Sequence, residues 1–292
     1  MMPSHKRALL YGGAALSLVA LGFAVANGHC QADALTLLSS ADVQLRLAHG
    51  MPAKDRHGAP LTARAEMIKQ SVAQLALVER ELPGLAVTAE FMGFAHMLQG
   101  QFGEAAAAYG KARQCTDCGE EQRDVLAFNQ ARMLAQAGQR DEALVVFAQN
   151  KTALDARYGP QRLLEEATIL RELGRPTEAT ARLDQVLQNP PVSPMASLQA
   201  GLELAQLGHL ERAASAFASA AEHVPIADYH LARLKLQQGH VDTCLGLLGR
   251  VAKVLPTEVR RRLQDEAVAW SVVAADARFQ EILQSGTATP VR

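Results

Sequence analysis

Residues Phe91–Ala112 read FMGFAHMLQGQFGEAAAAYGKA, and this stretch decides the fold. Gly93 lies in a first apolar segment, and Gly100 then interrupts the pattern. Ala105 follows this interruption by five residues, and Tyr109 comes four residues later. A glycine lets the chain turn at the end of a helix, because a left-handed backbone costs glycine little. The small residue lets a second helix pack closely and the tyrosine fills the space between them, so the stretch predicts a helical hairpin.

The same pattern recurs along the chain. Turn glycines lie at intervals of 31 to 38 residues: Gly100, Gly138, Gly174, Gly208 and Gly239. A small residue follows each glycine by five positions: Ala105, Ala143, Ala179, Ala213 and Cys244. A large apolar residue comes four positions later: Tyr109, Phe147, Leu183, Phe217 and Leu248. One hairpin cannot bury its own apolar face, so we expect the units to stack into a solenoid. No segment shows a run of alternating strand residues, and the predicted fold class is all-α.

This pattern resembles the tetratricopeptide repeat over about residues 85–256. The similarity is greatest in the unit that contains Gly93, Gly100 and Tyr109, and in the unit that ends at Pro225. The resemblance implies a right-handed superhelical solenoid of about five helical hairpins.

Two features depart from the family pattern. Gln130 and Glu166 stand where a family member usually has leucine. The leading tryptophan is replaced in every unit: Ala89, Ala127, Leu163, Ser197 and Asp228.

The sequence divides into four predicted parts. These are an N-terminal signal or transmembrane segment, N-terminal helices with a loop, the repeat array, and capping helices with a tail: residues 1–30, 31–84, 85–256 and 257–292. Proline and glycine in Met51–Leu61 predict the loop between the first two helices. We expect Trp270 and Phe279 to cover the apolar face of the last repeat.

The N-terminal part predicts export. An uncharged stretch of nineteen residues, Ala8–Ala26, follows Lys6 and Arg7. Its length is close to the roughly 20 residues that cross a bilayer as a helix, and the cationic flank should stay in the cytoplasm. We therefore expect a protein tethered to the membrane and facing the periplasm or the cell exterior. Ala24-Val25-Ala26 also fits a signal cleavage site, so a soluble secreted or periplasmic form cleaved after Ala26 is the alternative.

Cys115 and Cys118 form the compact motif CTDC. Gly119 stands where haem attachment requires histidine, which excludes that chemistry. A zinc site needs about four ligands, and a thioredoxin-like centre needs a βαβ setting; the sequence shows neither. The favoured interpretation is a disulfide that ties the loop between the first and second repeats in an oxidising compartment. Free thiols, a redox centre and a metal site stay as alternatives.

Composition and motifs exclude several classes of function. The 292 residues carry a net charge of −1, which removes the electrostatic reason to expect nucleic-acid binding. The sequence contains no GxSxG, P-loop, GxGxxG or HExxH motif. We therefore expect a protein without catalytic activity, without a cofactor, and with neither a small-molecule substrate nor a nucleic-acid partner.

The resemblance implies a binding surface. In this family the first helix of each hairpin lines a concave groove in which extended or helical peptides bind. The matching positions give ten candidate groove residues: Phe94, Met97, Phe128, Arg132, Leu164, Leu198, Leu202, Tyr229, Arg233 and Leu236. The same row also includes Val87, Glu90, Val125, Ala135, Gln161, Thr168, Arg171, Met195, Ala205 and Ile226.

This row is unusually apolar for a surface that faces solvent, and such a strip normally marks a binding site. We predict an interaction scaffold that binds a protein or a peptide, with an amphipathic helix in the groove as the expected mode. The alternative is a structural or oligomerising repeat protein whose groove is filled by its own N-terminal helices.

Overall fold

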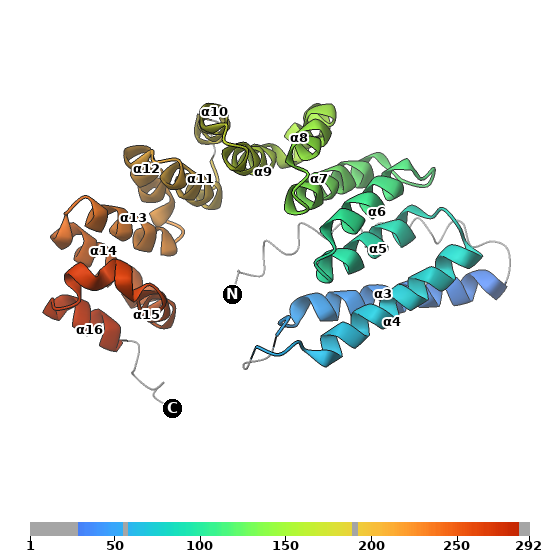
Figure 1. The fold of residues 1–292 in the computed structure, drawn as a ribbon, viewed down its shortest axis with the longest axis horizontal. Coiled ribbons are helices and arrows are strands. Elements are labelled where there is room, and N and C mark those ends of the chain that lie inside the picture. The colour runs from blue at the N-terminus through green and yellow to red at the C-terminus, as the bar shows by residue number, and fades with distance from the viewer. Residues whose placement is uncertain (1–28, 55–57, 189–191, 286–292) are drawn as a thin grey trace. The chain divides into compact units, whose positions relative to one another are not determined.

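The computed structural model describes residues 29–54, 58–188 and 192–285, and the regular elements in these ranges are helices (Figure 1). No strand lies in these ranges, where extended pairing is limited to one isolated bridge between Lys54 and Pro60. The predicted all-α fold is therefore confirmed.

The chain divides into two compact units, Met1–Arg162 and Leu163–Arg292, each considered by itself below. The helices described in unit 1 are α3 (His29–Gly50), α4 (Thr62–Glu81), α5 (Ala86–Leu98), α6 (Phe102–Gln114), α7 (Glu120–Gln136) and α8 (Arg140–Gln149). The boundary falls inside α9 (Lys151–Glu172). Unit 2 continues with α10 (Pro176–Gln188), α11 (Pro194–Gln206), α12 (Leu210–Ala221), α13 (Ile226–Gln237), α14 (Val241–Val254), α15 (Pro256–Asp265), the 3₁₀ helix η1 (Ala267–Val273) and α16 (Ala277–Ser285).

Each predicted turn glycine lies between the two helices of a hairpin. All five have positive φ angles, between 70° and 85°. At the end of α5, the Gly100 N–H donates to the Met97 carbonyl over 3.0 Å, and the Gln101 N–H donates to the His96 carbonyl over 2.9 Å. This pair of bonds satisfies carbonyls that the helix end leaves free, and it requires the left-handed backbone that glycine adopts readily.

The two helices of a hairpin approach closely because one residue at the contact lacks a side chain. A Cβ atom on Gly93 would lie 2.8 Å from Cε1 of Tyr109, and one on Gly201 would lie 2.6 Å from Cε1 of Phe217. The five small residues that follow the turns, from Ala105 to Cys244, are fully buried. The predicted packing rule of the hairpin is therefore present in the structure.

Helices α3 and α4 form a further antiparallel hairpin, which packs on α5. Buried residues of α3 recur at spacings of three and four: Ala34, Leu38, Ala41, Leu45 and Ala48. The Arg64 guanidinium joins this hairpin to the repeats, because it donates to the carbonyls of Ala48 and Leu98 over 3.1 and 3.0 Å. Residues 29–81 thus add a helical pair before the first repeat.

Helix α9 contains a kink that the repeat pattern does not predict. Tyr158 has non-helical angles (φ −132°, ψ 22°), and Pro160 follows it inside the helix. A proline removes a helix hydrogen bond and so bends or breaks a helix. The buried Arg162 side chain donates through Nε to Asp155 over 2.8 Å, which ties the two sides of the kink together.

The C-terminal helices complete the core of unit 2. Trp270 and Phe279 are buried, with ring centroids 6.3 Å apart, and Trp270 lies 5.5 Å from the ring of Tyr229 on α13. Residues 1–28 of the predicted signal or transmembrane segment, residues 1–30, lie outside the described ranges, and α3 begins at His29. None of the helices in the described part of the chain has the length and hydropathy needed to cross a bilayer.

Candidate functional site

The ten candidate groove residues fall into two classes of exposure. Five of them are buried, at most 7% exposed: Phe94, Phe128, Leu164, Leu198 and Tyr229. The others keep accessible surface: Met97, Arg132, Leu202, Arg233 and Leu236. The largest apolar side chains of the row therefore pack inside the protein, and the accessible surface lies on their neighbours.

In unit 1, side chains from outside the row cover two of its rings. His49 of α3 lies against Phe94, with ring centroids 5.6 Å apart. Tyr158, at the kink of α9, stacks on Phe128 at 5.0 Å, and the Arg132 guanidinium lies 6.0 Å from the same ring. The repeat positions alone contain no signal for His49 or Tyr158, because neither stands at a position of the repeat pattern.

A buried carboxylate lies beside these rings. Glu90 on α5 is 7% exposed and accepts a hydrogen bond of 2.7 Å from Nε2 of Gln122. Burial raises the pKa of Glu90; the Gln122 hydrogen bond opposes this rise, nearby Asp42 adds to it, and Arg46 opposes it. Asp42 and Arg46 are themselves paired over 2.7 Å on α3. Glu90 thus makes a buried polar contact between α5 and α7, with an ion pair of α3 nearby.

In unit 2, a polar network borders the row between α9 and α11. Glu203 accepts hydrogen bonds from Thr168 over 2.9 Å and from Nε of Arg171 over 2.8 Å. Thr168 and Arg171 belong to the predicted row, whereas Glu203 was missed because it follows Leu202 at a position that the row does not include. The network links the first helices of two successive hairpins.

An apolar strip remains accessible next to this network. Met195, Leu202 and Ala205 lie on one side of α11, half-buried against the core of unit 2. Leu198 lies between them in the sequence and is buried. We call Met195, Leu198, Leu202 and Ala205 the α11 strip.

On α13 the chain covers part of the row itself. Nε1 of Trp270 donates to the Tyr229 hydroxyl over 3.3 Å, and the Arg262 guanidinium lies 5.6 Å from the Tyr229 ring. Burial raises the pKa of Tyr229 to about 12. Arg233 pairs with Glu266 over 3.1 Å. Ile226 and Leu236, at the two ends of this row segment, stay half-buried.

Two departures from the family pattern have structural partners. Gln130 accepts a hydrogen bond from Arg113 over 2.7 Å, and Arg113 also donates to Asn150 over 2.7 Å. Glu166 accepts from Nε of Arg182 over 2.7 Å. Each polar residue at a leucine position is thus paired with an arginine from the second helix of a hairpin, which offsets the cost of burying it.

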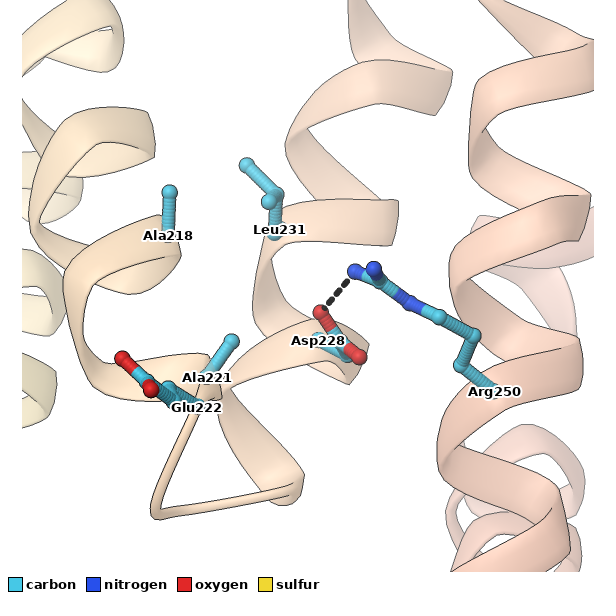
Figure 2. Close-up of a pocket in the computed structure, with 6 residues that line it drawn as sticks. All are labelled: Ala218, Ala221, Glu222, Asp228, Leu231 and Arg250. Carbon is cyan, nitrogen blue, oxygen red and sulfur yellow. Dashed lines mark hydrogen bonds and ion pairs between the residues drawn. The ribbon is translucent and has the colours of Figure 1, made fainter.

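A third departure lies at a surface hollow of about 480 Å³. It is lined by Ala218, Ala221, Glu222, Asp228, Leu231 and Arg250 (Figure 2). Asp228 stands where the family has tryptophan and is buried, and it accepts a hydrogen bond of 2.7 Å from Arg250. The ion pair occupies a place where an indole would pack, and the alanines leave the space beside it open.

Cys115, Cys118 and Cys244 are free thiols in the described ranges, and Cys115 is half-buried whereas the other two are buried. Burial raises the pKa of Cys115 and of Cys118, and it raises the pKa of Cys244 to about 11. The disulfide between Cys115 and Cys118 stays a prediction.

Comparisons with known proteins agree with this fold. A tetratricopeptide repeat model matches residues 125–149, which span most of α7 and all of α8. The C-terminal part of a TPR repeat-containing protein from Cytophaga hutchinsonii is similar in structure, with a TM-score of 0.53 at 10% sequence identity, over 85% of this chain and 93% of that chain. The chain therefore has the fold of tetratricopeptide-repeat proteins, and residues 125–149 match the repeat itself.

Two other solved structures share smaller similarity with this chain. One is a tetratricopeptide repeat protein from Parabacteroides merdae, with a TM-score of 0.48 at 15% identity, over 86% of this chain and 100% of that chain. The other is pilF of Pseudomonas aeruginosa, with a TM-score of 0.48 at 14% identity, over 78% of this chain and 98% of that chain. No curated protein matches the sequence.

Proposed function

We propose that this protein is a non-enzymatic scaffold that binds a segment of a partner protein along the α11 strip. The observation that carries the proposal is the half-buried apolar surface of Met195, Leu202 and Ala205 on the first helix of a hairpin. An accessible apolar strip bordered by polar groups is typical of protein-binding surfaces.

The surroundings of the strip favour a helical partner. Arg171 and Glu203 form an ion pair at the α9 side of the strip. Because these two charges neutralise each other, a partner that binds the strip does not have to supply a charge to pair with either of them. Met195, Leu202 and Ala205 recur at helical spacing and offer a narrow apolar contact along α11. An amphipathic helix with apolar residues at spacings of three and four matches such a surface.

The proposal includes export. It rests on the apolar stretch Ala8–Ala26 and its cationic flank, which would tether the repeats at the outer side of the membrane. Mass spectrometry of the mature N-terminus, with fractionation of intact cells, tests this part separately. A membrane-bound chain that keeps residues 1–26 supports the tether, whereas a soluble chain that begins at Asn27 supports cleavage.

Site-specific crosslinking tests the binding surface. A photo-crosslinking amino acid at Met195 should capture a partner polypeptide in intact cells, and the same group at Val254 should not. Val254 on α14 is 60% exposed and provides a matched apolar control outside the row. Leu202→Asp should lower capture at Met195 by at least about tenfold, because losing a central apolar contact costs about 2 kcal/mol or more.

The control substitution is Val254→Asp, which should leave capture at Met195 unchanged. Circular dichroism and Tm must be unaltered for both substitutions, so that lost capture reports the surface and not unfolding. If Leu202→Asp does not reduce crosslinking from Met195, the partner does not bind along the α11 strip and the proposal is wrong.

A structural or oligomerising repeat protein is the second candidate. The contacts of His49, Tyr158 and Trp270 with row residues favour it, because the chain's own side chains cover parts of the row. The same crosslinking experiment separates the two candidates. Crosslinks from Met195 that join only copies of this chain, or only residues within one copy, support the second candidate.

A further inference from the structure

The turn between α6 and α7 brings Cys115 and Cys118 close together. Helix α6 ends at Gln114, and the Cys118 N–H then donates to the Cys115 carbonyl over 3.2 Å. In a four-residue turn of this kind the first and last Cα atoms lie within about 7 Å. A disulfide joins Cα atoms about 4.4–6.8 Å apart, so the turn brings the two cysteines into bonding range with little movement of the backbone.

Asp117, one of the two residues between the cysteines, binds the start of the first repeat hairpin. Both carboxylate oxygens of Asp117 accept hydrogen bonds from the Ala86 N–H, over 3.0 and 3.2 Å. Helix α5 begins at Ala86, and Leu85 before it supplies no capping side chain. Asp117 therefore satisfies one of the free N–H groups at this helix end and places a negative charge at its positive pole.

The two thiols differ in access. Cys118 is 3% exposed, whereas Cys115 is half-buried and donates from Sγ to the Lys111 carbonyl over 3.4 Å. An oxidant in solution therefore reaches Cys115 first. Burial raises the pKa of both thiols, and Asp117 raises it further, so only a small fraction of each thiol is the thiolate that reacts with an oxidant.

We propose that Cys115 and Cys118 are a reversible thiol–disulfide site that holds Asp117 in place on the N-terminus of α5. The oxidant is an external disulfide, carried by a small thiol compound or by another protein. The Cys115 thiolate attacks one sulfur of that disulfide and expels the other sulfur as a thiolate. The Cys118 thiolate then attacks the Cys115 sulfur and expels the second external thiolate. The two cysteines lose two protons and two electrons, and the external disulfide is reduced to two thiols.

Thiol trapping tests the bond. The full chain, purified in detergent, is equilibrated with reduced and oxidised glutathione at a series of ratios and then alkylated. Trypsin should release residues 114–123 as one peptide with both cysteines. With rising oxidised glutathione we expect this peptide to lose both alkyl groups together and to become lighter by two hydrogens. Cys244→Ser should leave this result unchanged, whereas Cys115→Ser and Cys118→Ser should each abolish it.

Hydrogen exchange tests the effect on α5. The disulfide closes a four-residue loop and should slow hydrogen exchange in the first turn of α5 by up to about twentyfold. This factor is the loop-closure entropy lost by the open state, converted to a change in the opening equilibrium. Asp117→Ala should still form the disulfide but lose this slowing, because the cap is absent. Thiols that stay open to alkylation at the highest oxidised glutathione would overturn the proposal. A disulfide that leaves exchange in α5 unchanged would overturn it equally.

Discussion

At the scale of single residues, Gly201 and Phe217 set the distance between α11 and α12. We expect Gly201→Ala to destabilise unit 2, because the new Cβ would lie 2.6 Å from Cε1 of the buried Phe217 ring. Overpacking of this kind costs about 1–3 kcal/mol. That exceeds the roughly 0.5–1 kcal/mol that alanine gains over glycine inside a helix. Chemical denaturation of the full chain measures the difference.

Gly246 in α14 provides the matched control, since a Cβ built there meets nothing within 4 Å. Gly246→Ala should therefore stabilise by up to about 1 kcal/mol. Equal effects of the two substitutions would show that close helix contact does not decide the choice of glycine at Gly201.

Residue patterns predicted the hairpins because each sequence rule for a turn or a close helix contact concerns the residue type at a single position. A turn that needs positive φ, or a contact that excludes a Cβ, selects glycine wherever it occurs. Gln130 and Glu166 could not be explained in this way, because their partners Arg113 and Arg182 lie at positions without a repeat rule. Their pairing depends on side-chain geometry that the spacing does not contain.

At the scale of the helices, His230 makes the fold around α13 sensitive to pH. The imidazole lies against the rings of Phe217 and Tyr229, with centroids 5.5 and 5.6 Å away. Burial lowers the pKa of His230 to about 4, and the charges of Arg262 and Arg233 add to the effect. The unfolded chain binds a proton on this residue near pH 6.5, whereas the folded chain does so only near pH 4.

Between these pH values the unfolded state holds more protons, so stability falls as the pH is lowered from about 6.5 to 4. His230 alone should account for a loss on the order of 3 kcal/mol in the free energy of unfolding across this window. His230→Phe keeps the ring contacts and should remove that loss, with little change at pH 7.5. Urea denaturation at pH 7.5, 5.5 and 4.5 gives the comparison, and parallel pH profiles for both proteins would contradict the assignment.

The repeat pattern assigns no role to residues 151–158, and the structure places a helical segment there. Pro160 inside this helix accounts for the non-helical backbone of Tyr158, because a proline bends or breaks a helix. That Tyr158 stacks on Phe128 could not be predicted, because the direction of a kinked helix depends on packing with its neighbours.

At the scale of the whole molecule, segments outside the repeats decide which row residues stay accessible. Trp270 covers Tyr229 and Tyr158 stacks on Phe128, whereas Leu202 is only half-buried and keeps accessible surface. Repeat positions place the row on the first helices of the hairpins, but they carry no information on these contacts. The accessible part of the candidate site therefore follows from tertiary structure alone.

Trp270→Ala tests how far the packing of the C-terminal helices extends. Removing a buried indole costs about 3–5 kcal/mol, because a cavity remains beside Tyr229 and Phe279. In repeat proteins stability is a sum of nearest-neighbour terms, so the loss should concentrate in α13–α16. Hydrogen exchange should accelerate there and stay unchanged in α3–α6.

Val272→Ala, at a position 78% exposed in η1, is the control and should change stability by no more than about 0.5 kcal/mol. Equal loss of protection in α3–α6 would mean that the two units unfold as one cooperative body.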